Sequence, residues 1–124
     1  MVLDGQYDSY SGYVAYAFIS INPTTLTAKL IYSFVASADC GFCSINPQGT
    51  AIVFGALPSN DYSEIYVYSI TAATTTQLTS DGGDYPAWSP NGTEIVYTRT
   101  QQGDGGLWMM AADGSGKRRV TKAQ

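Results

Sequence analysis

Residues 87–97, AWSPNGTEIVY, decide the fold, because an ungapped counterpart, SINPQGTAIVF, occupies residues 44–54. A second pair recurs at almost the same distance, with IYVYSI at 65–70 paralleled by LWMMAA at 107–112. A repeat of about 43 residues that carries several short β-like runs is typical of a β-propeller. The sequence therefore predicts an all-β protein built from propeller blades.

The third unit shows the plan of one blade most clearly. Its expected strands are residues 85–89, 94–98, 107–111 and 117–121. Pro90-Asn91-Gly92 is a turn, because Pro presets φ at the first turn position and Asn-Gly readily adopts positive φ. The two inner strands are apolar on both faces, as in a sheet that is covered on both sides. We expect four-stranded antiparallel meanders stacked on one another.

The chain is predicted to be a single partial propeller domain, residues 1–124, with about two and a half to three blades. Its expected units are residues 1–34, 35–80 and 81–124. The first unit is incomplete: residues 16–21 parallel 65–70, but the segment with the Pro-x-Gly-Thr turn is missing. Its opening strand is therefore absent, and residues 1–3 are read as the tail of its second strand.

Residues 77–97, QLTSDGGDYPAWSPNGTEIVY, resemble the WD40-like repeat of TolB-type β-propellers. That pattern is Leu-Thr, an Asp/Gly loop, Pro-x-Trp-Ser-Pro-Asp-Gly and a strand of the type Ile-x-Phe. Asn91 stands where Asp is usual, which preserves the turn chemistry. The resemblance is most specific over residues 77–121. It implies a ring of commonly about six or seven blades, a periplasmic or extracytoplasmic location, and a role in binding proteins or peptides.

The length of 124 residues is too short for a closed six-bladed ring, which needs roughly 250 residues at this period. Three arrangements are open: part of a longer parent, a homo-oligomer that completes the ring, or an open stack. A partial propeller exposes two apolar blade faces, and large exposed apolar patches usually mark association surfaces. We therefore expect self-association, most simply as a homodimer.

Composition argues against several other partners. The net charge is −4 and only 13% of residues are charged, so neither a nucleic acid nor an acidic lipid surface is indicated. Lys117-Arg118-Arg119 is expected to be a solvated outer strand. No apolar stretch reaches membrane-spanning length, so no membrane insertion is expected. Asp4, Gln6 and Asp8 interrupt any signal-peptide core, which leaves the resemblance as the only indication of location.

Cys40-Gly41-Phe42-Cys43 is the pattern that looks most like chemistry. Thioredoxin-type redox use needs the first cysteine at a helix N-terminus, whereas this pair leads into a strand. A structural zinc site needs four ligands, which two cysteines without histidine reach only if two copies share an axis. Two nearby thiols or a tight local disulfide are the favoured interpretations. No cofactor and no metal are expected.

The Asp/Gly loop between the second and third units supplies the candidate binding residues. Calcium needs six or more oxygen ligands, and Asp81 and Asp84 supply only two carboxylates, so turn formation explains them first. If the loops between blades line the upper face of a ring and contact a ligand, the candidates are Asp39, Asp81, Asp84 and Tyr85.

Catalysis is not indicated. The chain has no histidine to activate a serine or cysteine, and no acidic pair is nominated for carboxylate catalysis. We expect a non-catalytic binding or scaffold module. One alternative is a piece of the propeller domain that accompanies prolyl-oligopeptidase-type hydrolases. Another is a carbohydrate-binding propeller, although Trp88 and Trp108 are expected to be core residues.

Overall fold

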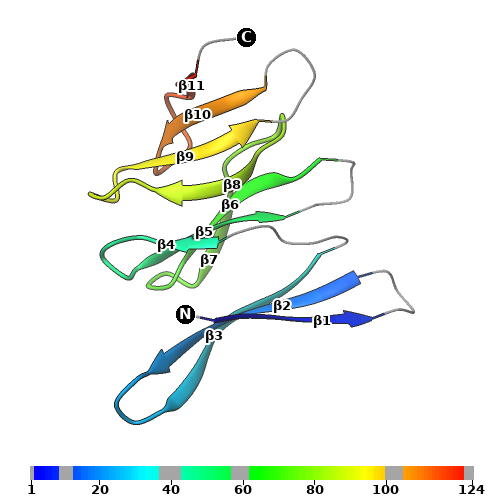
Figure 1. Cartoon of the computed structure of the whole chain (residues 1–124), viewed down its shortest axis with the longest axis vertical. Coiled ribbons are helices and arrows are strands. Elements are labelled where there is room, and N and C mark those ends of the chain that lie inside the picture. Colours follow the sequence, from blue (N-terminus) through cyan, green and yellow to red (C-terminus); the bar gives the residue numbers. More distant parts are fainter. Residues whose placement is uncertain (1, 9–12, 37–42, 57–61, 100–104, 122–124) are drawn as a thin grey trace. The chain divides into compact units, whose positions relative to one another are not determined.

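A computed structural model describes residues 2–8, 13–36, 43–56, 62–99 and 105–121, which form eleven strands and no helix. The strands make three antiparallel sheets, which Figure 1 traces in chain order from blue to red. The all-β fold class, with blades that are antiparallel meanders, is confirmed. The chain divides into two compact units, Met1–Cys40 and Gly41–Gln124, which are described separately.

The first unit holds a three-stranded sheet in the order β1-β2-β3. Its strands are β1 (Val2–Asp8), β2 (Tyr13–Asn22) and β3 (Thr27–Ala36). The sheet has no counterpart of an opening strand among the described residues, as the missing repeat segment predicted. The sequence placed only residues 1–3 in β1, but the strand continues to Asp8, because its backbone pairs with β2 from Val2↔Ile19 to Asp8↔Tyr13.

The second unit holds two four-stranded sheets of the same plan, which we call the second and third sheets. The second sheet consists of β4 (Cys43–Ile45), β5 (Ala51–Ala56), β6 (Glu64–Ser69) and β7 (Thr74–Gln77). The third sheet consists of β8 (Asp84–Trp88), β9 (Glu94–Arg99), β10 (Gly106–Ala111) and β11 (Arg118–Arg119). Each strand of the third sheet begins and ends within three residues of its expected position.

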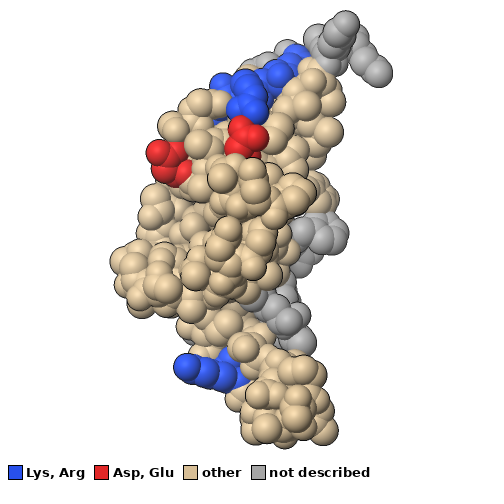
Figure 2. Space-filling view, turned by 90° about the vertical axis from the view of Figure 1, so that its left-hand side faces the viewer, with Lys and Arg blue, Asp and Glu red and all other residues tan. Residues whose placement is uncertain are grey.

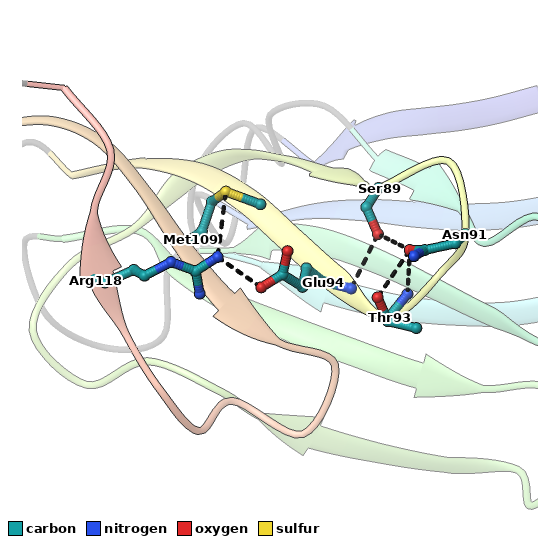
Figure 3. A network of polar contacts seen from close by, with 6 residues as sticks. All are labelled: Ser89, Asn91, Thr93, Glu94, Met109 and Arg118. Carbon is teal, nitrogen blue, oxygen red and sulfur yellow. Dashed lines mark hydrogen bonds and ion pairs between the residues drawn. The ribbon is translucent and has the colours of Figure 1, made fainter.

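The repeated turn uses different side chains in its two copies. In the second sheet, the Asn46 side-chain oxygen accepts hydrogen bonds from the backbone N–H of Thr50 at 2.8 Å and of Ala51 at 3.0 Å. In the third sheet, the Asn91 side-chain oxygen accepts from the hydroxyls of Ser89 and Thr93, both at 2.8 Å (Figure 3). Both copies place glycine at positive φ, 70° at Gly49 and 75° at Gly92. The turn is therefore maintained by its backbone geometry.

The core of the second unit lies between its two sheets. The buried members are Val53, Ile65, Leu78, Ile95, Tyr97 and Met110, with Val67, Trp88 and Trp108 packed against them. In β5 every residue from Ile52 to Ala56 is buried, which explains why its sequence shows no alternation. Strand β9 alternates instead, with Ile95 and Tyr97 buried and the residues between them half-buried. Burial on both faces thus holds for β5 but not for β9.

Gly83 lies at a close contact between the two sheets. Its backbone N–H donates to the carbonyl oxygen of Ser63 at 2.8 Å. A Cβ atom at this position would lie 2.8 Å from Cγ1 of Ile65 and 3.2 Å from Cδ2 of Tyr97. Because both neighbours are buried in the core, they have little room to move.

Replacing Gly83 with alanine is therefore expected to destabilise the fold by about 1–3 kcal/mol through overpacking. Urea unfolding followed by circular dichroism measures the change. Gly105→Ala is the matched control, because a Cβ there meets only the Arg99 carbonyl oxygen at an ordinary 3.5 Å. Equal stability of the two variants would contradict the packing described for Gly83.

Candidate functional site

Three of the four predicted binding residues lie together, in the loop that leads from β7 to β8 and in the first two residues of β8. They are Asp81, Asp84 and Tyr85. Asp39 lies outside the described residues. The backbone bond from Gly83 to Ser63 joins this loop to the residues that precede β6, where Tyr62 is 49% exposed. We call the surface formed by Tyr62, Ser63, Asp81, Asp84 and Tyr85 the loop edge.

Asp81 is tied to the third sheet by an ion pair. Its Oδ2 atom lies 2.5 Å from Nη2 of Arg99, and the arginine side chain is 13% exposed while that of Asp81 is 46% exposed. The guanidinium carbon of Arg99 lies 4.5 Å from the ring centroid of Trp108. A guanidinium over an indole ring is held by a cation–π interaction as well as by the carboxylate. Asp81 therefore anchors the loop and keeps part of its carboxylate in solvent.

Asp84 occupies a place that a glycine leaves open. A Cβ atom at Gly55 in β5 would lie 2.9 Å from Oδ1 of Asp84 and 3.2 Å from Oγ of Ser63. The same Oδ1 atom accepts the backbone N–H of Tyr85 at 2.9 Å, and the Thr98 hydroxyl donates to the Asp84 carbonyl oxygen at 3.1 Å. Among the residues that the structure describes, no cationic side chain forms an ion pair with Asp84.

Tyr85 is held in an unusual backbone conformation. Its φ is 50°, in the left-handed region that few non-glycine residues adopt, and the pairing of β8 with β9 shifts register between Asp84 and Ala87. Its side chain is left 52% exposed. Such a conformation costs on the order of 1–3 kcal/mol and persists only where the surroundings enforce it. The hydrogen bond from Tyr85 N–H to Asp84 is one such constraint.

Glu64, a buried carboxylate that the sequence analysis did not single out, holds the loop between β7 and β8 through hydrogen bonds. Glu64 is 2% exposed; its Oε2 accepts the Thr79 hydroxyl at 2.5 Å, and both carboxylate oxygens lie 3.2 Å from the backbone N of Gly82. The Thr79 hydroxyl in turn accepts the N–H of Ile65 at 2.8 Å. Burial, and after it the charge of Glu64, raise the pKa of the Tyr66 hydroxyl. Glu64 thus fixes the backbone from which the loop edge departs.

Clusters of metal-ligating side chains and long apolar helices are both absent from the described part of the chain. It contains no grouping of three or more His, Cys, Asp or Glu side chains that could hold a metal ion. None of its segments forms a helix of the length and apolarity needed to cross a bilayer.

Comparisons with known proteins agree with the arrangement of four-stranded antiparallel sheets. No family model matches the sequence. TolB from Acinetobacter baumannii is similar in structure, with a TM-score of 0.70 and 21% identity over 91% of this chain and 30% of that one. A putative TolB from Agrobacterium tumefaciens gives a TM-score of 0.63 and 18% identity over 97% of this chain and 46% of that one. The chain has a TolB-like β-propeller fold.

The fold is also similar to that of a β-propeller other than TolB. The β-propeller domain of the Trilobed protease from Pyrococcus furiosus gives a TM-score of 0.54 and 12% identity, covering 95% of this chain and 42% of that one. The chain thus spans between about a third and a half of the length of these structures. At these identities the similarity establishes the fold.

Both tryptophans of this TolB-like repeat take part in packing. The indole N–H of Trp88 donates to the Ser44 carbonyl oxygen at 3.1 Å, across the contact between the second and third sheets. Trp108 packs against the core and carries the Arg99 guanidinium over its ring. Both are half-buried rather than fully buried. This arrangement agrees with the expectation that they are core residues.

The cysteine pattern can be followed only in part. Cys43 begins β4 opposite Phe54 and is half-buried. Burial raises the pKa of its thiol, which lowers the fraction of reactive thiolate near neutral pH. Cys40 lies outside the described residues, so the expected proximity or disulfide of the two cysteines stays a prediction.

Trp88→Ala is expected to lower the free energy of unfolding by about 3–5 kcal/mol, because it removes a large side chain from between two sheets. Trp88→Phe keeps most of the apolar contact and loses the bond to Ser44, so about 1 kcal/mol is expected. Denaturant titration monitored by circular dichroism measures both. A near-neutral Trp88→Ala variant would show that the packing does not depend on this ring.

Glu64→Gln is expected to cost about 1–3 kcal/mol, because a buried amide group would place an N–H donor where the Gly82 N–H now finds an acceptor. Glu94→Gln is the matched control. Its ion pair with Arg118 lies on the surface and is expected to contribute less than about 1 kcal/mol. If the two variants were equally stable in urea, Glu64 would not support the loop in the way described.

Proposed function

We propose that this chain is a non-catalytic binding module of TolB-like type, which contacts a protein or peptide through the loop edge and completes its ring by self-association. The observation that carries the proposal is the pair of exposed tyrosines, Tyr62 and Tyr85, beside the carboxylate of Asp84. We further propose the periplasmic or extracytoplasmic location that the sequence resemblance implies.

The chemistry of the loop edge suits a peptide ligand with basic side chains. Tyrosine offers a large amphipathic surface with little conformational entropy to lose, which is why it is enriched at interfaces. The carboxylates of Asp81 and Asp84 and a net charge of −4 favour a cationic partner by electrostatic attraction. A lysine or arginine could also lie over a tyrosine ring.

The loop edge is preorganised, which supports a binding role over an incidental one. The ion pair of Asp81 with Arg99 and the bond from Gly83 to Ser63 hold the loop on both sheets. A loop that is already ordered loses less entropy when it binds, so more of the contact energy becomes affinity. The positive φ of Tyr85 means that this order is maintained against a local conformational cost.

A second candidate is the propeller part of a larger hydrolase, which the likeness to the propeller domain of a protease favours. In that case the loop edge would contact the substrate or another domain, and this chain alone would leave a bound peptide intact.

The test is selection from an array of short immobilised peptides of random sequence. The unmodified protein is expected to retain peptides rich in Lys and Arg without cleaving them, which mass spectrometry checks. Tyr85→Ala is expected to raise the dissociation constant of a selected peptide by at least about tenfold. Leu26→Ala is the control, because Leu26 is 81% exposed and belongs to the other unit. Absence of selection, or equal affinity of the two variants, would contradict a role for the loop edge.

A further inference from the structure

The second sheet packs against the third sheet through one apolar face. Because the sheets are repeats, the third sheet has an equivalent apolar face. Its four apolar members are Val96, Leu107, Met109 and Val120. Their repeat counterparts in the second sheet are Val53, Ile65, Val67 and Leu78. Val96 is opposite Met109 in the pairing of β9 with β10, so the two share a face. Alternation along β9 places that face away from buried Ile95 and Tyr97. We call it the outer face.

Equivalent residues on this face are buried in the second sheet and exposed in the third sheet. Ile65 is 0% and Leu78 is 8% exposed, because the third sheet covers them. Leu107 and Val120, which occupy the same places in the repeat, are 41% and 52% exposed. The local hydrogen bonding is also repeated: the Thr121 hydroxyl accepts the N–H of Leu107 at 3.0 Å, as that of Thr79 accepts the N–H of Ile65. The outer face therefore has the construction of a blade contact that is not covered.

A charged border lies beside this apolar surface. Nη2 of Arg118 lies 2.7 Å from Oε1 of Glu94 and 3.9 Å from the sulfur of Met109 (Figure 3). Figure 2 shows basic side chains gathered over the third sheet with acidic ones next to them. An apolar centre bordered by charges is the usual anatomy of a protein interface.

The first sheet carries an apolar face of its own. The pairing of β2 with β3 places Ile19 opposite Leu30 and Ile21 opposite Ala28, so these side chains share one face. Ile21 is 44% and Leu30 is 59% exposed. Lys29 is opposite Ser20, one position away in each strand, and so projects from the other face. Lys29 is the only charged residue between 18 and 32, so the part of this face that β2 and β3 form with Ile19, Ile21, Ala28 and Leu30 carries no charge.

Gly55 in the second sheet and Thr98 at the equivalent position in the third sheet indicate whether a sheet with an acidic opening strand can pack on the outer face. In the second sheet, Gly55 leaves room for the carboxylate of Asp84, which belongs to the opening strand of the next blade. The third sheet has Thr98 at the equivalent position, so an acidic opening strand would meet a side chain there. Among the described residues, the first sheet consists of β1, β2 and β3 and has no counterpart of that opening strand.

We propose that the outer face of the third sheet binds the Ile21–Leu30 face of the first sheet in a second copy of this chain. The proposal rests on the self-association proposed above and assigns its surfaces. Such a contact is heterologous, so two copies joined in this way form a closed ring when the rotation between them permits.

The experiment blocks each surface separately. Leu107→Asp introduces a charge into the outer face, and Leu30→Asp does so in the first sheet. Each is expected to raise the dissociation constant for self-association by at least about tenfold, measured by light scattering coupled to gel filtration. Leu26→Asp, in the exposed turn between β2 and β3, is the control and is expected to assemble normally. Val120→Asp replaces the Leu107 variant if circular dichroism shows that the latter is unfolded.

Mixing the variants decides the geometry. An equimolar mixture of Leu107→Asp and Leu30→Asp is expected to regain assembly, because the intact first sheet of one meets the intact outer face of the other. A monomeric unmodified protein would overturn self-association altogether. An assembled protein that Leu107→Asp leaves unchanged would preserve self-association and overturn the outer face as its site. Loss with Leu107→Asp but not with Leu30→Asp would overturn the head-to-tail pairing.

Discussion

The dry contact between the second and third sheets is the constraint on which the rest of the second unit depends. Ile65 from one sheet and Ile95, Tyr97 and Met110 from the other are almost completely buried there. Gly83 permits the close approach, because any side chain at its position would displace Ile65 or Tyr97. The loop edge follows from this contact, since Gly83 and Asp81 are bonded to opposite sheets and place Asp84 and Tyr85 between them.

Stacked blades share the difficulty of all repeat assemblies, which is that the terminal units keep an uncovered face. Repeat proteins usually solve this with terminal units whose outer surface is polar. On the outer face of the third sheet, the ion pair of Arg118 with Glu94 lies beside Met109, while Leu107 and Val120 are about half exposed. In composition, this face is intermediate between the polar outer surface of a repeat protein and the apolar face by which two blades pack together.

The sequence was sufficient for the fold because a propeller encodes its architecture in a repeated pattern. The turn at 90–92 and the apolar strand that follows it located every strand of the third sheet. The extent of β1 could not be predicted in this way, because that strand has no repeat motif and its end is set by pairing with β2. Tyr85 could be predicted as a candidate because it follows the Asp/Gly loop directly, but its positive φ accompanies the register shift at the start of β8.

The residues that the sequence did not reveal are mostly those at which the repeat is broken. Arg99 stands where the second sheet has Ala56, and it alone makes the ion pair with Asp81 possible. Glu64 stands where the third sheet has Gly106, at which a Cβ atom would come within 2.5 Å of the Thr121 hydroxyl.

Each of these differences between equivalent positions has its effect through a neighbour from elsewhere in the chain, so the repeat pattern alone cannot predict that effect. Positions that obey the repeat maintain the stack of sheets. Those that depart from it give each loop and each face its own chemistry, and specific binding by a fold of this kind must arise there.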